Sequence, residues 1–509
     1  MTIFNDDKKR MLRDFVLALS LANLGFYKLW RELFFRPVPA EKFFIKFLPG
    51  PLHFTAALFD IVLMALVFWA GIQLARRSKS LFLLRTAQLL FVLTVIFFTG
   101  HILLVHLGPY LSNMAHNKRM IIMDGLAPVT IVLFALFFRR FYCSTVTFCA
   151  ILVLAFAPFV LVTFTRAGLR IFTPDFMPVF MDQPLAKPFP TVKGSPHVVL
   201  LLFDGMDERL CFAARPPALR YPELDRFCRE AFYAENAYPP GNCTDLSLPS
   251  FTIGKRVVNS HPVDSNRMKL LLEGSPDEVY WNGLPNLFSK TRDLGLNTAL
   301  VGWHLPYGRV FGSSLNYFYW ATGEIPRIAR NQTFETATLD CLKRVLPLQH
   351  KRDHINEYLN ILEHAKKIVS NPAYNLAMVH WPVPHAPQIY DYKRRQFTYF
   401  ASSITGYFGN VALADDALGE VRRRMERDGA WDDAAVLIFS DHHWLNSWMY
   451  DGGNDARSVF MLKLPHQSKP VVYSRQFNTV LIHHLTLALL RREIVTPEQL
   501  VAWLDKNRS

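Results

Sequence analysis

The sequence has few cysteines, and none of them forms a paired motif. Its 509 residues include six cysteines, without a CxxC pair and without the spacing of a zinc finger. This pattern argues against a metal site built on cysteine. Four cysteines follow residue 172: Cys211, Cys228, Cys243 and Cys341. One or two disulfides there, or buried free thiols, are both compatible with an exported domain.

The sequence also lacks a nucleic-acid-binding motif, although its net charge is +14. Lysine and arginine residues cluster beside long apolar runs instead, which favours contact with anionic lipid at a membrane surface. We therefore expect a membrane partner and no nucleic-acid partner.

No small-residue cleavage site follows the first apolar run, so we interpret that run as a retained helix and not as a signal peptide. A transmembrane helix needs about 20 mostly apolar residues. Five stretches meet this requirement: 15–34, 53–75, 87–107, 120–138 and 146–165. Residues 1–172 are therefore predicted to form a five-helix transmembrane domain.

The basic residues between these stretches predict how the protein is oriented. "KKRMLR" precedes the first stretch, "RRSKS" follows the second and "RR" follows the fourth. The positive-inside rule then places the N-terminus in the cytoplasm and everything after residue 172 on the periplasmic or extracellular side. We expect a multi-pass protein of the cytoplasmic (inner) membrane. Asp60 and Asp124 lie in or near the spans, where pairing between helices is the favoured role.

A different pattern begins after the membrane region. Residues 173–196 contain six prolines and no helical period, which predicts an extended linker. Residues 197–509 then alternate short apolar runs with helical segments, as in an α/β domain with a mostly parallel central sheet. The runs are 197–203, 297–303, 376–381, 434–439 and 458–464.

Acidic and histidine residues follow most of these predicted strands. In open α/β sheets, ligands bind at the carboxyl ends of strands. The residues at these ends are Asp204, His304, His380, His385, Asp441, His442 and His443. Any one of them alone is most often a turn or rim residue, but several in one domain indicate a site. Aspartate and neutral histidine suit zinc, and manganese is a second candidate.

The stretch "YPPGNCTDLSLPS" (238–250) offers four nucleophile candidates: Cys243, Thr244, Ser247 and Ser250. A Pro-Gly break precedes it, and "TDLSLPSF" is predicted to begin a helix. The N-terminus of a helix attracts anions such as a phosphate or sulfate ester. A divalent cation nearby would favour the hydroxylate form of a serine or threonine.

Residues 197–465 resemble the alkaline phosphatase superfamily, specifically its sulfatase-like branch. The similarity is carried by "VVLLLFDG", "LGLNTALVGWHLPYG", "HWPVPHAP" and "YFGNVALADDALGEVRRRMERDGAWDDAAVLIFSDHHW". The resemblance implies an alkaline phosphatase-like sandwich. It also implies that the metal ligands are Asp204, Asp441, His442 and the nucleophile Thr244. The implied substrate contacts are His385 and His304, with His380 and His443 as further members of the binding site.

The sequence departs from true sulfatases at several of these motifs. Leucine or phenylalanine stands where the arginine of their formylglycine motif belongs, whether Cys243 or Ser247 is placed at its nucleophile, and His443 replaces a glycine. These departures favour a threonine nucleophile. A different alignment, on "SLP", puts Asn242 at the position of that threonine. A threonine nucleophile after several N-terminal spans resembles the phosphoethanolamine and phosphoglycerol transferases of bacterial envelopes.

The resemblance thus implies a metal-dependent transferase. It would move a phosphoethanolamine-like or phosphoglycerol head group from a phospholipid donor to an envelope lipid or glycan through Thr244. The alternative is a hydrolase of phosphate or sulfate esters that uses the same site with water. A third possibility is a metal-free pseudoenzyme that senses lipid or binds a partner.

Overall fold

The computed structural model describes residues 3–35, 43–44, 50–112, 140, 142–172, 182–321, 333–346, 348–401 and 403–508. The chain divides into two compact units. The first comprises Met1–Pro37, Phe47–Met177 and Pro326–Gln349, and the second comprises Val38–Lys46, Pro178–Ile325 and His350–Ser509. Residues 326–349 therefore belong to the first unit although the residues on both sides of them belong to the second. The reverse holds for residues 38–46.

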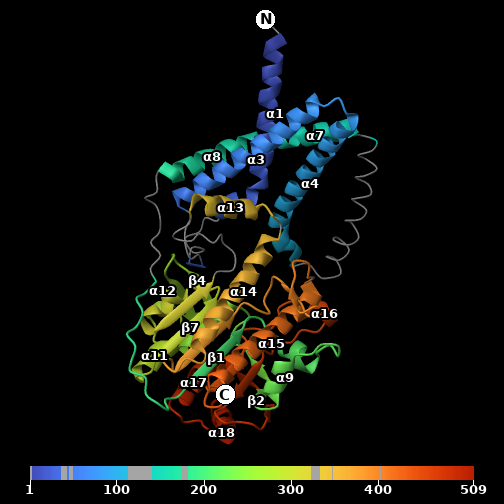
Figure 1. Cartoon of the computed structure of the whole chain (residues 1–509). Helices are drawn as coiled ribbons and strands as arrows, with labels where there is room; N and C mark the ends of the chain where they lie inside the picture. Colours follow the sequence, from blue (N-terminus) through green and yellow to red (C-terminus); the bar gives the residue numbers. More distant parts are fainter. Residues whose placement is uncertain are drawn as a thin grey trace. The chain divides into compact units, whose positions relative to one another are not determined.

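The first unit is helical (Figure 1). Its longer helices are α1 (Ile3–Gly25), α3 (Pro51–Arg77), α4 (Leu81–Ser112), α7 (Tyr142–Ala155), α8 (Ala157–Phe172) and α13 (Phe334–Arg344). A short helix, α2 (Tyr27–Trp30), and a π-helical turn, Arg31–Phe35, follow α1. Among the described residues, three stretches are long and apolar enough to cross a membrane: Pro51–Arg77, Leu81–Gly100 and Tyr142–Phe172.

These three stretches contain most or all of the second, third and fifth predicted spans. The first predicted span, 15–34, falls on α1, α2 and the π-helical turn, which are helical but are not among the three. The fourth, 120–138, lies outside the described residues, as does Asp124. Five transmembrane helices therefore stay a prediction.

Buried polar residues connect the helices of the first unit. The indole of Trp30 donates to Asn23 Oδ1 at 2.7 Å, and the hydroxyl of Thr163 on α8 donates to the same oxygen at 3.1 Å. Arg76 on α3 pairs with Asp14 on α1 at 2.8 Å. Asp60 is buried on α3, but neither of its carboxylate oxygens accepts a hydrogen bond from the described residues. The expected pairing of Asp60 between helices is therefore not seen among them.

An eight-stranded sheet forms the centre of the second unit, in the order β14-β2-β13-β12-β1-β9-β7-β8. The strands β12, β1, β9, β7 and β8 run parallel, whereas β13 is antiparallel to both of its neighbours. The bounds are β14 (Val471–Tyr473), β2 (Phe232–Ala234), β13 (Phe460–Lys463), β12 (Ala435–Phe439), β1 (Val198–Phe203), β9 (Leu376–Trp381), β7 (Thr298–Trp303) and β8 (Tyr317–Ala321). The expected α/β domain with a mostly parallel sheet is confirmed.

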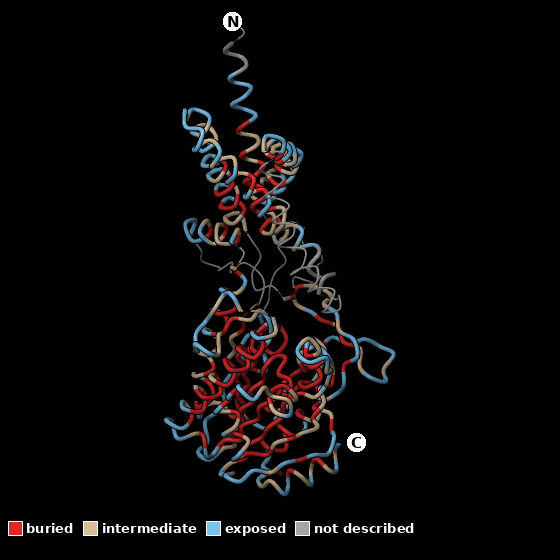
Figure 2. Tube along the Cα trace, turned by 90° about the vertical axis from the view of Figure 1, so that its right-hand side faces the viewer, coloured by how far each residue is buried: buried red, intermediate tan, exposed pale blue. Residues whose placement is uncertain are grey.

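Helices cover both faces of this sheet, so the second unit is a three-layered sandwich (Figure 2). Alternate residues of β1 point into two separate cores, as the period-two geometry of a strand requires. One face packs against α9 (Pro222–Cys228), α14 (Gln349–Ile368) and α15 (Ser403–Arg427). The other packs against α10 (Thr244–Ile253), α11 (Leu287–Asp293), α12 (Tyr307–Phe311), α17 (Ile482–Leu490) and α18 (Pro497–Asn507).

Shorter elements complete this unit. A three-stranded sheet is formed by β4 (Val257–Pro262), β5 (Met268–Leu272) and β6 (Glu278–Tyr280). Two strand pairs are β3 (Ala237–Tyr238) with β15 (Phe477–Asn478), and β10 (Tyr390–Asp391) with β11 (Gln396–Phe397). A short helix, α16 (Trp448–Asp451), follows β12. All six cysteines lie in the described residues, and all are free thiols, so the open question of disulfides is answered for this structure.

Candidate active site

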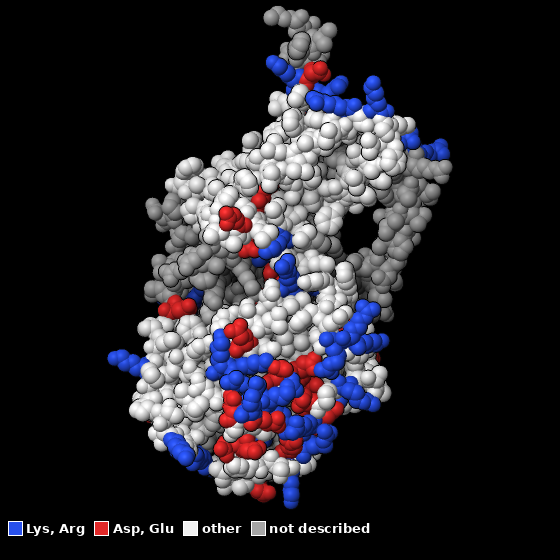
Figure 3. Space-filling view, viewed as in Figure 1, with Lys and Arg blue, Asp and Glu red and all other residues white. Residues whose placement is uncertain are grey.

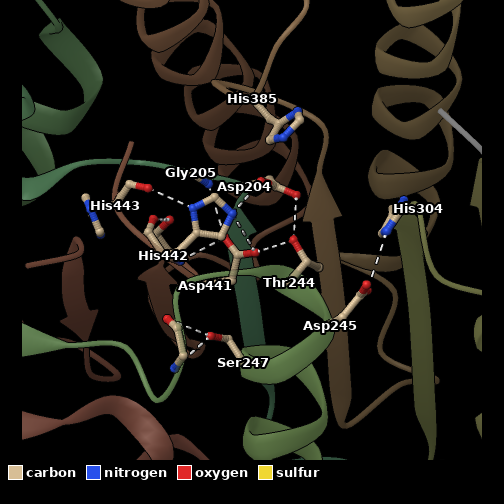
Figure 4. Close-up of polar contacts among 12 residues, drawn as sticks. Asp204, Gly205, Thr244, Asp245, Ser247, His304, His385, Asp441, His442 and His443 are labelled. Carbon is tan, nitrogen blue, oxygen red and sulfur yellow. Dashed lines mark hydrogen bonds and ion pairs between the residues drawn. The ribbon is translucent and has the colours of Figure 1, made fainter. Parts of the chain in front are cut away.

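Two adjacent strands bring the acidic residues together. Asp204 follows the last residue of β1, and Asp441 lies two residues after the end of β12, the parallel neighbour of β1. With His442 they form a buried group in which one ligand atom from each residue lies within 4.8 Å of the others (Figure 4). The carboxyl ends of these two strands therefore create a cluster able to hold a metal ion.

The backbone of Gly205 lies beside the cluster and contacts it. Gly205 has a positive φ of 73°, a conformation that favours glycine, and its N–H donates to Asp441 Oδ1 at 3.1 Å. A Cβ atom at this position would lie 3.4 Å from the imidazole of His442. A side chain there would thus be strained and would press on a member of the cluster.

The imidazole of His442 is oriented by a backbone carbonyl. Its Nδ1 lies 2.7 Å from the carbonyl oxygen of His443, which can only accept, so Nδ1 carries the proton. Nε2 then faces the carboxylates, 3.4 Å from Asp204 Oδ1 and 3.5 Å from Asp441 Oδ2. A carbonyl that fixes the outer nitrogen of a histidine is a common arrangement behind metal ligands.

The carboxylates of Asp204 and Asp441 make the cluster negatively charged, which favours a positive group beside them. Burial acts to lower the pKa of His442, but the carboxylates of Asp441 and Asp204 raise it to about 10. In addition, Asp204 Oδ1 is buried without a hydrogen-bond donor among the described residues. Two buried carboxylates and an imidazole nitrogen that faces them fit a divalent cation, which would take the place of the proton on Nε2, and carboxylate and imidazole ligands suit zinc or manganese.

Thr244 lies at the first residue of α10, as the sequence predicted for the start of a helix. Its hydroxyl is 2.7 Å from Asp441 Oδ2 and 3.3 Å from Asp204 Oδ2, and the residue is 8% exposed. Gly254, in the left-handed conformation, ends the helix ten residues later. The Thr244 hydroxyl therefore lies beside the acidic cluster and at the positive end of the α10 dipole.

The other candidates in this stretch lie elsewhere. Ser247 is fully buried, and its hydroxyl is hydrogen-bonded to the backbone N–H and carbonyl of Gly241, both at 3.2 Å. Cys243 is the N-cap residue of α10, and burial raises the pKa of its thiol. Asn242 is exposed. Of these side chains, only the hydroxyl of Thr244 is hydrogen-bonded to the carboxylates.

The predicted binding histidines His385 and His380 differ in their exposure and in their contacts. His385, after β9, is exposed, and its Nδ1 lies 2.7 Å from the carbonyl of Ala386, which leaves Nε2 available. His380, within β9, is fully buried, with Nε2 3.3 Å from Asp204 Oδ2 and Nδ1 bonded to the hydroxyl of Tyr307. The structure thus places His380 behind the carboxylate, where it supports Asp204 and is not accessible to a substrate.

His304 lies on the side of Thr244 opposite His442 (Figure 4). Its φ of 70° is rare for a residue with a side chain, and its Nε2 lies 3.5 Å from Asp245 Oδ1. Phe44 stacks on the His304 ring at a centroid distance of 4.9 Å and an angle of 20°. Phe44 belongs to the same compact unit as His304, although it is far away in sequence.

His443 is largely buried. Burial is the larger cause that lowers the pKa of its imidazole, and the positive charge of neighbouring His442 lowers this pKa further. Its carbonyl supports His442, whereas its own Nδ1 has no hydrogen-bond partner among the described residues. Its side chain points away from Thr244 (Figure 4). The structure thus assigns the backbone of His443 to the site more clearly than its imidazole.

Sequence reasoning missed three residues around the site. Asp245 carried a signal, since it directly follows Thr244 at a helix start. Trp303, the last residue of β7, lies 5.2 Å from His385 and 5.5 Å from His304 between ring centroids, and its indole donates to buried Glu357 at 3.0 Å. Phe44 gave no signal, because its contact with His304 spans 260 positions of sequence.

Residues 196–446 match the protein-family model described as Sulfatase. This region is a sulfatase-like domain. Such a domain indicates an enzyme that acts on sulfate or phosphate esters. A comparison with curated proteins found no match.

Solved structures similar to this chain include several enzymes. The lipoteichoic acid synthase LtaP of Listeria monocytogenes is 14% identical over 59% of this chain and 73% of its own, with a TM-score of 0.41. The phosphonate monoester hydrolase of Agrobacterium radiobacter is 14% identical over 58% and 74%, with a TM-score of 0.39. A sulfatase from Pseudoalteromonas sp. is 14% identical over 61% and 74%, with a TM-score of 0.40.

Proposed function

We propose that this protein is a membrane-anchored, metal-dependent transferase. It moves a phosphoethanolamine-like or phosphoglycerol head group from a phospholipid to an envelope lipid or glycan through a phosphothreonine intermediate. The observation that carries this proposal is the position of Thr244, whose hydroxyl lies 2.7 Å from Asp441 and 3.3 Å from Asp204 at the N-terminus of α10. A threonine there is a nucleophile that needs no oxidation to formylglycine.

In the first step, Thr244 Oγ1 attacks the phosphorus of the donor lipid. The new Oγ1–P bond forms as the bond from phosphorus to the diacylglycerol oxygen breaks, and the hydroxyl proton of Thr244 passes to Asp441. His385 or His304 gives a proton to the departing diacylglycerol oxygen. In the second step, the acceptor hydroxyl loses its proton to the same histidine and attacks phosphorus, the Oγ1–P bond breaks, and Asp441 returns its proton to Thr244 Oγ1. The two steps allow the donor to leave before the acceptor binds.

The residues that would hold the metal ion are Asp204, Asp441, His442 and Thr244. When bound there, a divalent cation, with zinc preferred over manganese, lowers the pKa of the Thr244 hydroxyl and offsets negative charge on the phosphoryl group. Thr244 is the first residue of α10, where the positive end of the helix dipole favours an anionic substrate. Asp245 Oδ1 lies 3.5 Å from His304 Nε2, so a carboxylate faces this imidazole.

The membrane location is part of the same proposal. Basic side chains gather at one end of the first unit, where the N-terminal half of α1 and the C-terminal end of α3 lie (Figure 3). These residues are Lys8, Lys9, Arg10, Arg13, Arg76 and Arg77. Their position supports a multi-pass protein of the cytoplasmic membrane with this end in the cytoplasm and the sulfatase-like domain on the periplasmic or extracellular side.

The deciding experiment is mass spectrometry of the full chain after incubation with zinc and phosphatidylethanolamine, with Thr244→Ala as the matched variant. We expect a phosphoethanolamine adduct on the peptide that contains Thr244, absent from the variant. Release of free phosphoethanolamine in the presence of an acceptor alcohol would favour the hydrolase instead. No adduct, no released product and no bound metal would refute both activities and leave a binding protein.

A further inference from the structure

Helix α13 comes from the sulfatase-like region but packs in the helical unit. It lies between β8 and α14 in the sequence, within the residues that match the family model, yet its segment belongs to the first compact unit. Its partner is α3: Phe334 contacts Phe59 edge-on at 5.4 Å. Ala337 and Cys341, one helical turn apart, are 1% and 6% exposed within the same core. One apolar strip of α13 is therefore buried against a candidate membrane span.

Outside this strip, α13 exposes a further apolar side chain. Leu339 is 52% exposed, whereas Leu342 is partly buried against the same core as Ala337 and Cys341. Glu335 and Lys343 lie about one helical turn before and after Leu339, and Leu346, which is 57% exposed, follows the end of the helix. A helix that buries one strip against a candidate membrane span and exposes apolar side chains beside charged ones suits an apolar–aqueous boundary.

The surface of α3 that surrounds this contact is itself apolar and exposed. Beside Phe59, which is 49% exposed, its exposed side chains include Val62, Leu63, Leu66 and Val67. In a helix that crosses a membrane, such side chains contact lipid acyl chains. Phe334, which is 39% exposed and contacts Phe59, continues this surface onto α13.

The position of the contact along α3 places α13 near one membrane surface. Phe59 lies eight residues after Pro51, which corresponds to about 12 Å of helix. From Phe59 to the basic pair Arg76 and Arg77 is about 26 Å, close to the hydrocarbon thickness of about 30 Å. Helix α13 therefore contacts α3 toward the end opposite its basic pair, the end that the proposed orientation places at the outer surface.

We propose that α13 is an interfacial helix whose exposed apolar side chains, Phe334 and Leu339, contact phospholipid at the outer surface of the membrane. This inference rests on the proposed membrane location, but not on the reaction. Glu335, Asp340 and Lys343 then extend toward water from the rim of the helix. Because α13 is connected directly to the chain of the sulfatase-like domain on both sides, that domain is tied to the lipid surface at a second point, in addition to its N-terminal connection.

The test is photo-crosslinking of the full chain in vesicles of phosphatidylethanolamine and phosphatidylglycerol. A diazirine-bearing amino acid replaces Leu339, and the adducts are identified by mass spectrometry. Two matched positions serve as controls: Val67 on α3, which is 62% exposed, and Val472 on β14 of the sulfatase-like unit, which is 60% exposed. Each labelled protein must elute from a sizing column as the unlabelled protein does.

We expect phospholipid adducts at position 339 in a yield comparable with position 67, and only background at position 472. Crosslinks from position 339 to a second copy or to another part of the chain, with lipid adducts still present at 67, would overturn the role of α13 alone. Absence of lipid adducts at both 339 and 67 would overturn the membrane location as well. Equal lipid adducts at 472 would show unspecific labelling and would also refute the inference.

Discussion

The unpartnered carboxylate oxygen of Asp204 predicts how the protein responds to metal. In the folded chain, Asp204 and Asp441 are buried side by side, and like charges at such a distance repel each other. A cation that binds only the folded state removes this repulsion and stabilises the fold by about 3–4 kcal/mol at 100–1,000 times its Kd. Zinc should therefore raise the melting temperature, and a chelator should reverse the increase.

The variant Asp204→Asn should lose most of this response, because it removes one ligand charge. Thermal unfolding with and without zinc, together with metal analysis, measures both effects. Asp245→Asn is the matched control, since Asp245 lies next to Thr244 but outside the acidic cluster, and it should keep the zinc response. An equal zinc-dependent shift in Asp204→Asn would contradict the assigned ligand set.

The stacking of Phe44 on His304 predicts that substitution of Phe44 has a modest effect on kcat/KM. Aromatic pairs contribute about 0.5–1.5 kcal/mol, so Phe44→Ala should lower kcat/KM by about two- to tenfold through a less well-held imidazole. Phe44→Trp keeps an aromatic face and should retain activity close to that of the native chain. Steady-state kinetics on a phosphodiester substrate measures the effect. Equal activity of Phe44→Ala and the native chain would show that the stack does not position His304.

At this scale the sequence predicted the residues with local signals. Asp204, Asp441 and His442 follow buried strands, and Thr244 begins a helix, so their positions could be anticipated from short patterns. The burial of His380 was not predicted, because a strand-end histidine looks the same whether its ring faces a cleft or a carboxylate. Phe44 depended on a long-range contact, to which no local pattern responds.

At the scale of elements, helix α9 is held by a carboxylate from another helix. Asp415 on α15 accepts a hydrogen bond from the backbone N–H of Leu224 at 2.7 Å, in the first turn of α9. Burial raises the pKa of Asp415 to about 7 from its ordinary 3.8. Between these two values the folded state binds a proton that the unfolded state releases, so the free energy of unfolding falls as the pH rises from about 4 to 7.

The variant Asp415→Asn should remove this dependence, because an amide accepts the same hydrogen bond without titrating. Asp415 should contribute up to about 4 kcal/mol to the stability that the native domain loses across the window, and the variant should lack this share while Asp207, whose pKa burial also raises to about 7, keeps its own. Denaturant unfolding in detergent, followed by tryptophan fluorescence from pH 4 to 7, compares the two slopes. Asp433→Asn, at a side chain that is 75% exposed, is the control and should leave the native slope unchanged. Identical slopes in all three proteins would refute the buried proton.

Some strands of the sheet could be predicted from the sequence and others could not. The five apolar runs correspond to β1, β7, β9, β12 and β13, because strands buried on both faces have continuous hydrophobicity. The strands β2 and β14 have only three residues each and carry no such run. The antiparallel direction of β13 was also not predictable, since its apolar pattern is the same in either direction.

At the scale of the whole molecule, the compact units do not follow a single cut in the chain. Helix α13 belongs to the first unit and the segment around Phe43 and Phe44 to the second, although each is surrounded in sequence by the other unit. Sequence patterns classify a stretch by its own composition. The mixed composition of α13, with four charged residues among eleven, gave no indication that it packs against an apolar helix.

The packing of α13 in the first unit predicts how a fragment without the N-terminal helices should behave. A fragment that begins at residue 182 keeps α13 but lacks α3, so Ala337, Cys341 and Phe334 lose the apolar surface that covers them. We expect this fragment to self-associate or to require detergent, since apolar surface without a partner favours association. Replacement of residues 333–346 by a Gly-Ser linker should yield a monomer in light scattering. Both fragments equally lack Phe43, which is fully buried in the sheet core, so the difference between them reports on α13. If both were monomeric, the apolar strip of α13 would not need α3, and its packing there would be incidental to the fold.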